Sequence, residues 1–182
     1  MARHFHLRIE LTGGAPAAPG VLAGAVLLRV RGVLVLDWRL VGLNGSAVAL
    51  ARAAAADHRA AGDAQSARNA EWPLFFCAES LVNRCGEIAD FSVTHAGGRV
   101  TLSGFYGCAV SSDARFDIPW SALAGAAIRV GDMVVRRSGV SDPALTAEDS
   151  DRRRGWREEL RTRLRPIRAR RRTLVRAAPA TG

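Results

Sequence analysis

The net charge of this chain is confined to its C-terminal end. Residues 1–150 contain 14 arginines and 14 acidic residues, whereas residues 151–182 contain 12 arginines and only 3 acidic residues. The formal net charge of +9 at pH 7 therefore belongs to the last segment. This division indicates a nearly neutral folded body followed by a cationic extension, and only the extension is expected to attract an anionic partner.

The basic residues also exclude several classes of enzyme. All 26 of them are arginine, and the chain contains no lysine. Without a lysine the protein cannot form a Schiff base with pyridoxal phosphate, and it lacks the phosphate-binding lysine of P-loop proteins and ordinary kinases. The sequence shows no motif for another cofactor, so we expect the protein to have none.

Cysteine content and hydrophobic patterning predict a cytoplasmic protein. The three cysteines, Cys77, Cys85 and Cys108, are odd in number and form no CxxC pair, which favours reduced thiols over a disulfide framework. The first residues alternate charged and apolar side chains rather than forming a signal peptide. The longest uncharged run, residues 11–28, is interrupted by glycine and proline. We therefore expect no transmembrane segment.

The first half of the chain shows strand patterns followed by a helix pattern. Residues 4–11 alternate apolar and polar side chains, as a half-buried strand does. Two further strands are expected in the apolar runs 21–28 and 33–41. Turn and N-cap residues at 44–46 then predict an alanine-rich helix over about residues 47–60.

The second half repeats this order of strands and then a helix. Gly97 and Gly98 permit the positive φ angles of a tight hairpin. Pro119 has the φ angle that a first helical turn requires and predicts the start of a helix. Strands are expected over residues 72–77, 91–94, 99–102, 105–110 and 114–118.

Together these patterns predict an α+β fold. Mainly antiparallel strands fall into two groups, each followed by a helix, and an arginine-rich helical tail comes last. Residues 141–143, Ser-Asp-Pro, mark the end of the body. We therefore expect a globular α+β domain over residues 1–140 and a basic, partly helical or disordered extension over residues 141–182.

The extension contains its own helix signals. Residues 146–149 resemble a capping box, which marks the start of a helix. The apolar residues that follow recur at helical spacing and are Trp156, Leu160, Leu164 and Ile167. Pro166 is expected to end this helix near Leu164, because proline lacks the N–H group of the helical hydrogen bond.

The arginines of the extension form the strongest candidate binding surface. Guanidinium groups that neutralise phosphates would give salt-dependent, largely sequence-independent binding of nucleic acid. The same helix could instead lie on an anionic membrane, pack against the body of the protein, or remain a solvated extension without a partner. The candidate polyanion-binding residues are Arg152, Arg153, Arg154, Arg157, Arg161, Arg163, Arg165, Arg168, Arg170, Arg171, Arg172 and Arg176.

A second, weaker set of candidates consists of cysteine and histidine. Cys77, Cys85, His95 and Cys108 carry the thiolate and imidazole groups that zinc prefers, although their spacing matches no familiar zinc motif. Cys85 could also act as a nucleophile with His95 as its base. His58 stands between two charged residues and is expected at the surface.

These observations lead to one expected function and two alternatives. We expect a non-enzymatic cytoplasmic protein-interaction module, in which residues 1–140 dock a protein partner and the arginine-rich tail adds electrostatic attraction. One alternative is a small enzyme or metal-binding protein that depends on the cysteine and histidine residues. The other is a nucleic-acid-binding protein that uses residues 151–176.

Overall fold

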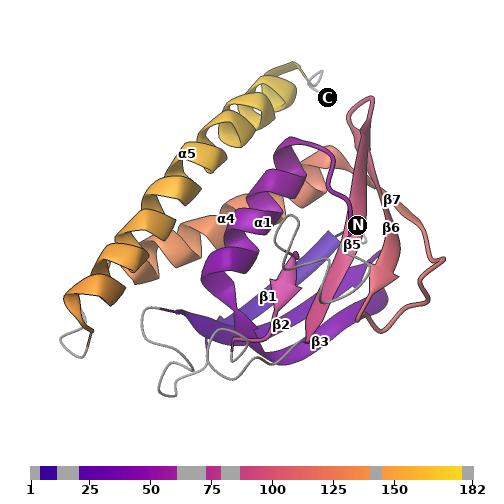
Figure 1. The fold of residues 1–182 in the computed structure, drawn as a ribbon. Helices are drawn as coiled ribbons and strands as arrows, with labels where there is room; N and C mark the ends of the chain where they lie inside the picture. Colours follow the sequence, from indigo (N-terminus) through magenta and orange to yellow (C-terminus); the bar gives the residue numbers. More distant parts are fainter. Residues whose placement is uncertain (1–4, 12–20, 61–72, 79–86, 140–144, 178–182) are drawn as a thin grey trace.

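The computed structural model describes residues 5–11, 21–60, 73–78, 87–139 and 145–177 (Figure 1). The first antiparallel sheet has the strand order β1-β2-β3, and the second has the order β4-β5-β6-β7. The strands of the first sheet are β1 (Phe5–Leu11), β2 (Ala23–Val30) and β3 (Val33–Gly42). Those of the second are β4 (Phe75–Phe76), β5 (Ile88–Ala96), β6 (Arg99–Tyr106) and β7 (Phe116–Pro119). The helices are α1 (Leu43–Ala55), α4 (Trp120–Ser138) and α5 (Ala147–Ala177).

This architecture confirms the predicted α+β class. Each sheet is followed directly in the chain by a helix, and α5 comes last. None of the helices in the described part of the chain is long and apolar enough to cross a membrane. The division into a domain that ends at residue 140 and a separate extension stays a prediction.

The helix α1 begins earlier than the sequence predicts. Asn44 does not cap the helix but lies inside its first turn, where its side-chain oxygen accepts a hydrogen bond from the backbone N–H of Leu22 at 2.7 Å. This bond holds the start of α1 against the entry to β2. Five of the eleven buried residues of α1 are alanines, Ala47, Ala53 and Ala54 among them, and these small side chains let neighbouring helices approach closely.

The second sheet contains the predicted glycine hairpin. Gly97 and Gly98 adopt φ angles of 51° and 82° between β5 and β6. The separate strand expected over residues 105–110 is wrong, because Phe105 and Tyr106 are the end of β6. The chain turns away at Gly107, which has a φ angle of 62° that L side chains rarely adopt.

The two sheets are joined where the end of β3 meets the segment after β4. Val41 of β3 forms an isolated antiparallel bridge with Cys77, which follows β4. The backbone N–H of Ala78 also donates to the carbonyl of Leu40 at 3.0 Å. The first and second sheets therefore share one continuous hydrophobic core, which includes residues of every helix.

The three helices pack on one another beside the sheets, with α5 on the side of α1 and α4 that faces away from the strands (Figure 1). Trp120, the first residue of α4, connects two of them, because its indole N–H donates to the carbonyl of Ala54 in α1 at 2.8 Å. Its side chain is 1% exposed. The beginning of α4 is therefore fixed against the end of α1.

The start of α5 agrees with the sequence, but its end does not. Thr146 accepts a hydrogen bond from the backbone N–H of Asp149 at 3.2 Å, which confirms the predicted start of the helix, and its hydroxyl donates to the carboxyl group of Asp149 at 2.7 Å. The predicted end near Leu164 is wrong, because α5 continues through Pro166 to Ala177. The proline itself is exposed, while neighbouring apolar residues on both sides of it are buried in the core.

Candidate anion-binding surface on the C-terminal helix

One side of α5 is fixed to the body of the protein. Leu160 and Leu164 are fully buried and Ile167 is 2% exposed, and all three belong to the main hydrophobic core. The helix packs against both α1 and α4. Since residues three and four apart share one side of a helix, the arginines between these anchors are directed to the flanks and the outer side. Their backbone positions are therefore set by the core.

The N-terminal half of α5 is close to neutral. Residues 147–159 contain five acidic residues and four arginines. Ion pairs along the helix join Arg152 to Glu148 at 3.0 Å and Arg154 to Asp151. Arg153 is buried, and Arg157 is half-buried. This half of the helix therefore offers little uncompensated charge to a partner, although each exposed ion pair contributes little to stability.

The C-terminal half of α5 is strongly cationic. Residues 160–182 contain eight arginines and no acidic residue. Arg161 and Arg163 reach back to Glu158 and Glu159, with nitrogen–oxygen distances of 3.1 and 2.9 Å. The positive charge is therefore concentrated beyond this point, where the helix itself supplies no carboxylate.

Two arginines of this half contact other helices. Arg168 forms an ion pair with Asp132 of α4. The guanidinium carbon of Arg170 lies 4.3 Å from the centre of the Trp120 ring, in a cation–π contact. Both contacts tie the cationic half of α5 to α4 while leaving the charges near the surface.

Three further arginines of this half are exposed. Arg165, Arg171 and Arg172 lie at the surface, and we find no ion pair for them within the described part of the chain. Arg176 lies in the last turn of α5, and its side chain is outside the described residues. The structure thus brings the candidate arginines together on one helix but divides them into a compensated and an uncompensated group.

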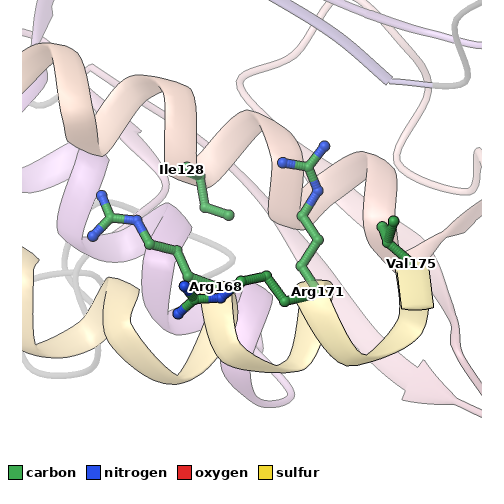
Figure 2. Close-up of a pocket in the computed structure, with 5 residues that line it drawn as sticks. Ile128, Arg168, Arg171 and Val175 are labelled. Atoms are coloured by element: carbon green, nitrogen blue, oxygen red, sulfur yellow. The ribbon is translucent and has the colours of Figure 1, made fainter. Parts of the chain in front are cut away.

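A recess of about 370 Å³ lies between α4 and the cationic half of α5. Figure 2 shows Arg168 and Arg171 extending from α5 on either side of Ile128, with Val175 at one end. The residues that line the recess are Ile128, Arg168, Arg171, Arg172 and Val175. The recess therefore combines three guanidinium groups with two apolar side chains.

The cysteine and histidine candidates do not come together among the described residues. His95 lies near the hairpin end of β5, where its Nε2 atom is 2.9 Å from the carbonyl oxygen of Ala53. Cys77 lies beside the other end of β5, since its N–H donates to the carbonyl of Glu87 at 3.1 Å. A strand rises about 3.3 Å per residue, so these two ends are roughly 25 Å apart. Cys85 lies outside the described residues.

The environment of Cys108 disfavours the thiolate form of its side chain. Burial, followed by the nearby Asp90, raises the pKa of the Cys108 thiol from 9.0 to about 12. The thiol therefore stays protonated at neutral pH, whereas a metal ligand or nucleophile must be a thiolate. Within the described part of the chain, no group of three histidine, cysteine or acidic residues is arranged to hold a metal ion. The enzyme or metal-binding alternative stays a prediction.

The structure contains a buried polar pair that sequence analysis missed. His58, expected at the surface, is 5% exposed, and its Nε2 atom lies 2.9 Å from Oδ1 of the fully buried Asp90. An imidazole beside a carboxyl group is the arrangement that orients a general base. Here the same oxygen of Asp90 also accepts backbone hydrogen bonds, so the pair fastens the segment after α1 to β5. The one sequence signal was an acidic residue inside the apolar run 88–91.

Comparison of the chain with protein-family models, with curated proteins and with solved structures gives no match. The function is therefore argued from the geometry and charge of the chain itself.

Proposed function

We propose that the chain is a non-enzymatic binding protein that holds nucleic acid through the C-terminal half of α5. The observation that supports this proposal is the concentration of eight arginines without an acidic residue on a helix whose apolar side is anchored in the core. Anchoring matters because the cationic groups are held in place before the partner arrives. Less conformational entropy is then lost on binding than with a disordered tail.

The spacing of the arginines suits a row of phosphates. Positions 161, 165, 168, 172 and 176 are three or four residues apart and therefore follow one side of the helix. At a rise of 1.5 Å per residue, this row is about 22 Å long. Duplex DNA carries one negative charge per approximately 1.7 Å of its axis, so several phosphates lie along such a length.

The packing of α5 favours nucleic acid over a membrane surface. A helix that lies on a bilayer buries its apolar side among the lipid chains. In this protein the apolar side of α5, with Leu160, Leu164 and Ile167, is already buried against α1 and α4. Arg165, Arg171 and Arg172 remain exposed to phosphates, while most of the surface that would enter a membrane is occupied.

The distribution of charge along α5 also favours the helix itself. Glu148 and Asp149 lie in the first turn of α5, and arginines gather toward its end, so the charges complement the helix dipole. The favourable interaction of arginine with the helix dipole is confined to the last turn, whereas the arginine row begins several turns earlier. The dipole therefore does not account for the whole row.

Docking of a protein partner by residues 1–140 stays a prediction.

Binding of a short fluorescent DNA duplex, measured by anisotropy across a range of salt concentrations, tests the proposal. The double variant R165Q/R172Q removes two exposed arginines of the row for which we find no ion pair in the described part of the chain. We expect it to weaken binding about tenfold or more at low salt, and to reduce the slope of log K against log salt by about 2.

The matched control is R136Q/R137Q, which removes the same charge from exposed residues in the last turn of α4. We expect this variant to change affinity less than about twofold, because the two arginines lie beside the compensated half of α5. Absence of salt-dependent binding by the full chain would refute the proposal. So would equal losses in both double variants.

A further inference from the structure

The recess between α4 and α5 differs from the rest of the arginine surface because apolar side chains line it together with arginines. Ile128 of α4 and Val175 of α5 supply apolar contacts, and Arg168, Arg171 and Arg172 supply cationic ones. Its volume of about 370 Å³ is within the range of small-molecule sites, roughly 300–1,000 Å³. The recess is open to solvent on its outer side, so it adds apolar contacts to the charge of the arginines without enclosing a ligand.

A glycine on α4, Gly125, leaves room for the guanidinium group of Arg171 beside the helix. At Gly125 a Cβ atom would lie 3.9 Å from the guanidinium carbon of Arg171 and 3.4 Å from Nη1 of Arg129. The two guanidinium groups therefore converge on the same position of α4, one from each helix. Convergent guanidinium groups are the arrangement that holds a phosphate through several charge-assisted hydrogen bonds.

The local balance of charge leaves Arg171 and Arg172 for a ligand. Asp132 is the only acidic residue of α4, and it is paired with Arg168. The last eighteen residues of α5 contain no acidic residue, and Arg171 and Arg172 form no ion pair within the described chain. The first turn of α4, near Arg170, adds the positive end of a helix dipole without an acidic residue to offset it.

We propose that this recess binds one nucleotide, with its phosphate held by Arg171 and Arg172 and its sugar or base packed on Ile128 and Val175. The proposal rests on the proposed function, because the nucleotide is the repeating unit of the nucleic acid that α5 would hold. The shared ligand chemistry is a phosphate ester with an apolar or flat group attached. Free nucleotides and the phosphorylated ends of strands both supply it.

Calorimetric titration of the full chain tests the phosphate and the apolar contacts separately. The probes are thymidine 5′-monophosphate, thymidine and inorganic phosphate. We expect saturable binding of the nucleotide, weaker binding of inorganic phosphate by about tenfold or more, and no saturation with thymidine. Equal affinities for the nucleotide and inorganic phosphate would overturn the apolar contacts and hence the proposal.

Two single variants locate the site. R171Q removes an exposed guanidinium from the recess, and R165Q removes an exposed guanidinium from the same helix outside it. We expect R171Q to weaken nucleotide binding about tenfold or more and R165Q less than about twofold. Equal losses would show that the general field of the helix, and not the recess, attracts the nucleotide.

Val175 offers a further check, because its side chain is 68% exposed and its replacement leaves the core intact. V175S should weaken binding of the nucleotide while leaving that of inorganic phosphate unchanged. Short oligonucleotides with and without a 5′-phosphate distinguish the source of the ligand. A preference for the phosphorylated strand assigns the recess to strand ends, and equal binding of both strands assigns it to free nucleotides.

This experiment can fail independently of the proposed function. Salt-dependent binding of duplex DNA with identical losses in R171Q and R165Q would retain the function and overturn the nucleotide site. Nucleotide binding that depends on Arg171, without binding of duplex DNA, would retain the site and overturn the function. Circular dichroism of each variant verifies that the fold is unchanged.

Discussion

A single carboxyl group, that of Asp90, joins three parts of the second sheet. Its Oδ1 atom accepts hydrogen bonds from the backbone N–H groups of Leu74 and Phe91, at 3.1 and 3.0 Å. The same atom lies 2.9 Å from Nε2 of His58. The residue is fully buried, so no solvent is available to replace these partners. Asp90 therefore holds the chain after α1, the entry to β4 and the strand β5 in one place.

Replacement of Asp90 by alanine should destabilise the protein strongly. Removing one partner from a buried hydrogen-bonded network leaves the other groups desolvated and unsatisfied, which costs about 3–5 kcal/mol. The free energy of unfolding from urea titration measures the effect. D90N keeps an oxygen acceptor and should lose less stability than D90A. The exposed Asp37 of β3 provides the control, because D37A should leave the unfolding midpoint unchanged. A wild-type midpoint in D90A would contradict this account.

Local sequence patterns do not reveal the pair of His58 and Asp90, for a physical reason. His58 is flanked by charged residues, which predicts exposure, and its partner stands 32 positions away. A long-range contact of this kind depends on the register between β5 and the segment after α1, where His58 and Val93 form an isolated bridge. Local sequence patterns carry no information about that register. The same limit applies to Cys108, whose raised pKa arises from burial in the folded chain.

At the scale of elements, sequence patterns predicted the kinds of structure better than their limits. The glycine hairpin and the Thr146 cap at the start of α5 are both local, and both are confirmed. The predicted end of α5 was wrong because it rested only on the helical hydrogen bond that Pro166 cannot form. Burial of Leu164 and Ile167 on either side of the proline offsets that loss.

The packing of α5 on α4 can be tested with two glycines that differ in their surroundings. A Cβ atom at Gly131 of α4 would lie 2.5 Å from Cδ1 of the buried Leu164, whereas one at Gly155 of α5 would meet nothing within 4 Å. We expect G131A to destabilise the protein by about 1–3 kcal/mol, because the core there is already filled.

The matched variant G155A should act in the opposite direction. Alanine in an open helical position favours the helix by about 0.5–1 kcal/mol over glycine. Thermal unfolding of both variants measures the two signs under the same conditions. Equal stabilisation by both substitutions would mean that α5 does not pack against α4 at Leu164.

At the scale of the whole molecule, the division of charge was visible in the sequence, but the attachment of the charged helix was not. The sequence showed both an apolar stripe and an excess of arginine in residues 151–182. Such a helix could bind nucleic acid, lie on a membrane, pack against the body of the protein or remain solvated. Only tertiary packing distinguishes among these four possibilities. In the structure α1 and α4 together form the surface that receives the stripe. No segment of the sequence reveals that composite surface by itself.

This attachment predicts what happens when the chain is cut after residue 140. The shortened chain loses Leu160, Leu164 and Ile167 from the core, and each buried aliphatic side chain contributes about 1.5–3 kcal/mol. That sum is comparable with the whole stability of a typical domain, about 5–15 kcal/mol. We therefore expect residues 1–140 to bind a hydrophobic dye and to lose a cooperative thermal transition.

The full-length variant R165Q/R172Q, which alters charge but leaves these anchors in place, should keep the wild-type midpoint. If residues 1–140 unfold cooperatively at the wild-type midpoint temperature, the predicted domain limit is correct and α5 is a separate extension of the domain. In that case, a loss of nucleic-acid binding on truncation is caused by the loss of charge alone. If residues 1–140 are unfolded, only charge variants of the full chain can test the role of the arginines in binding.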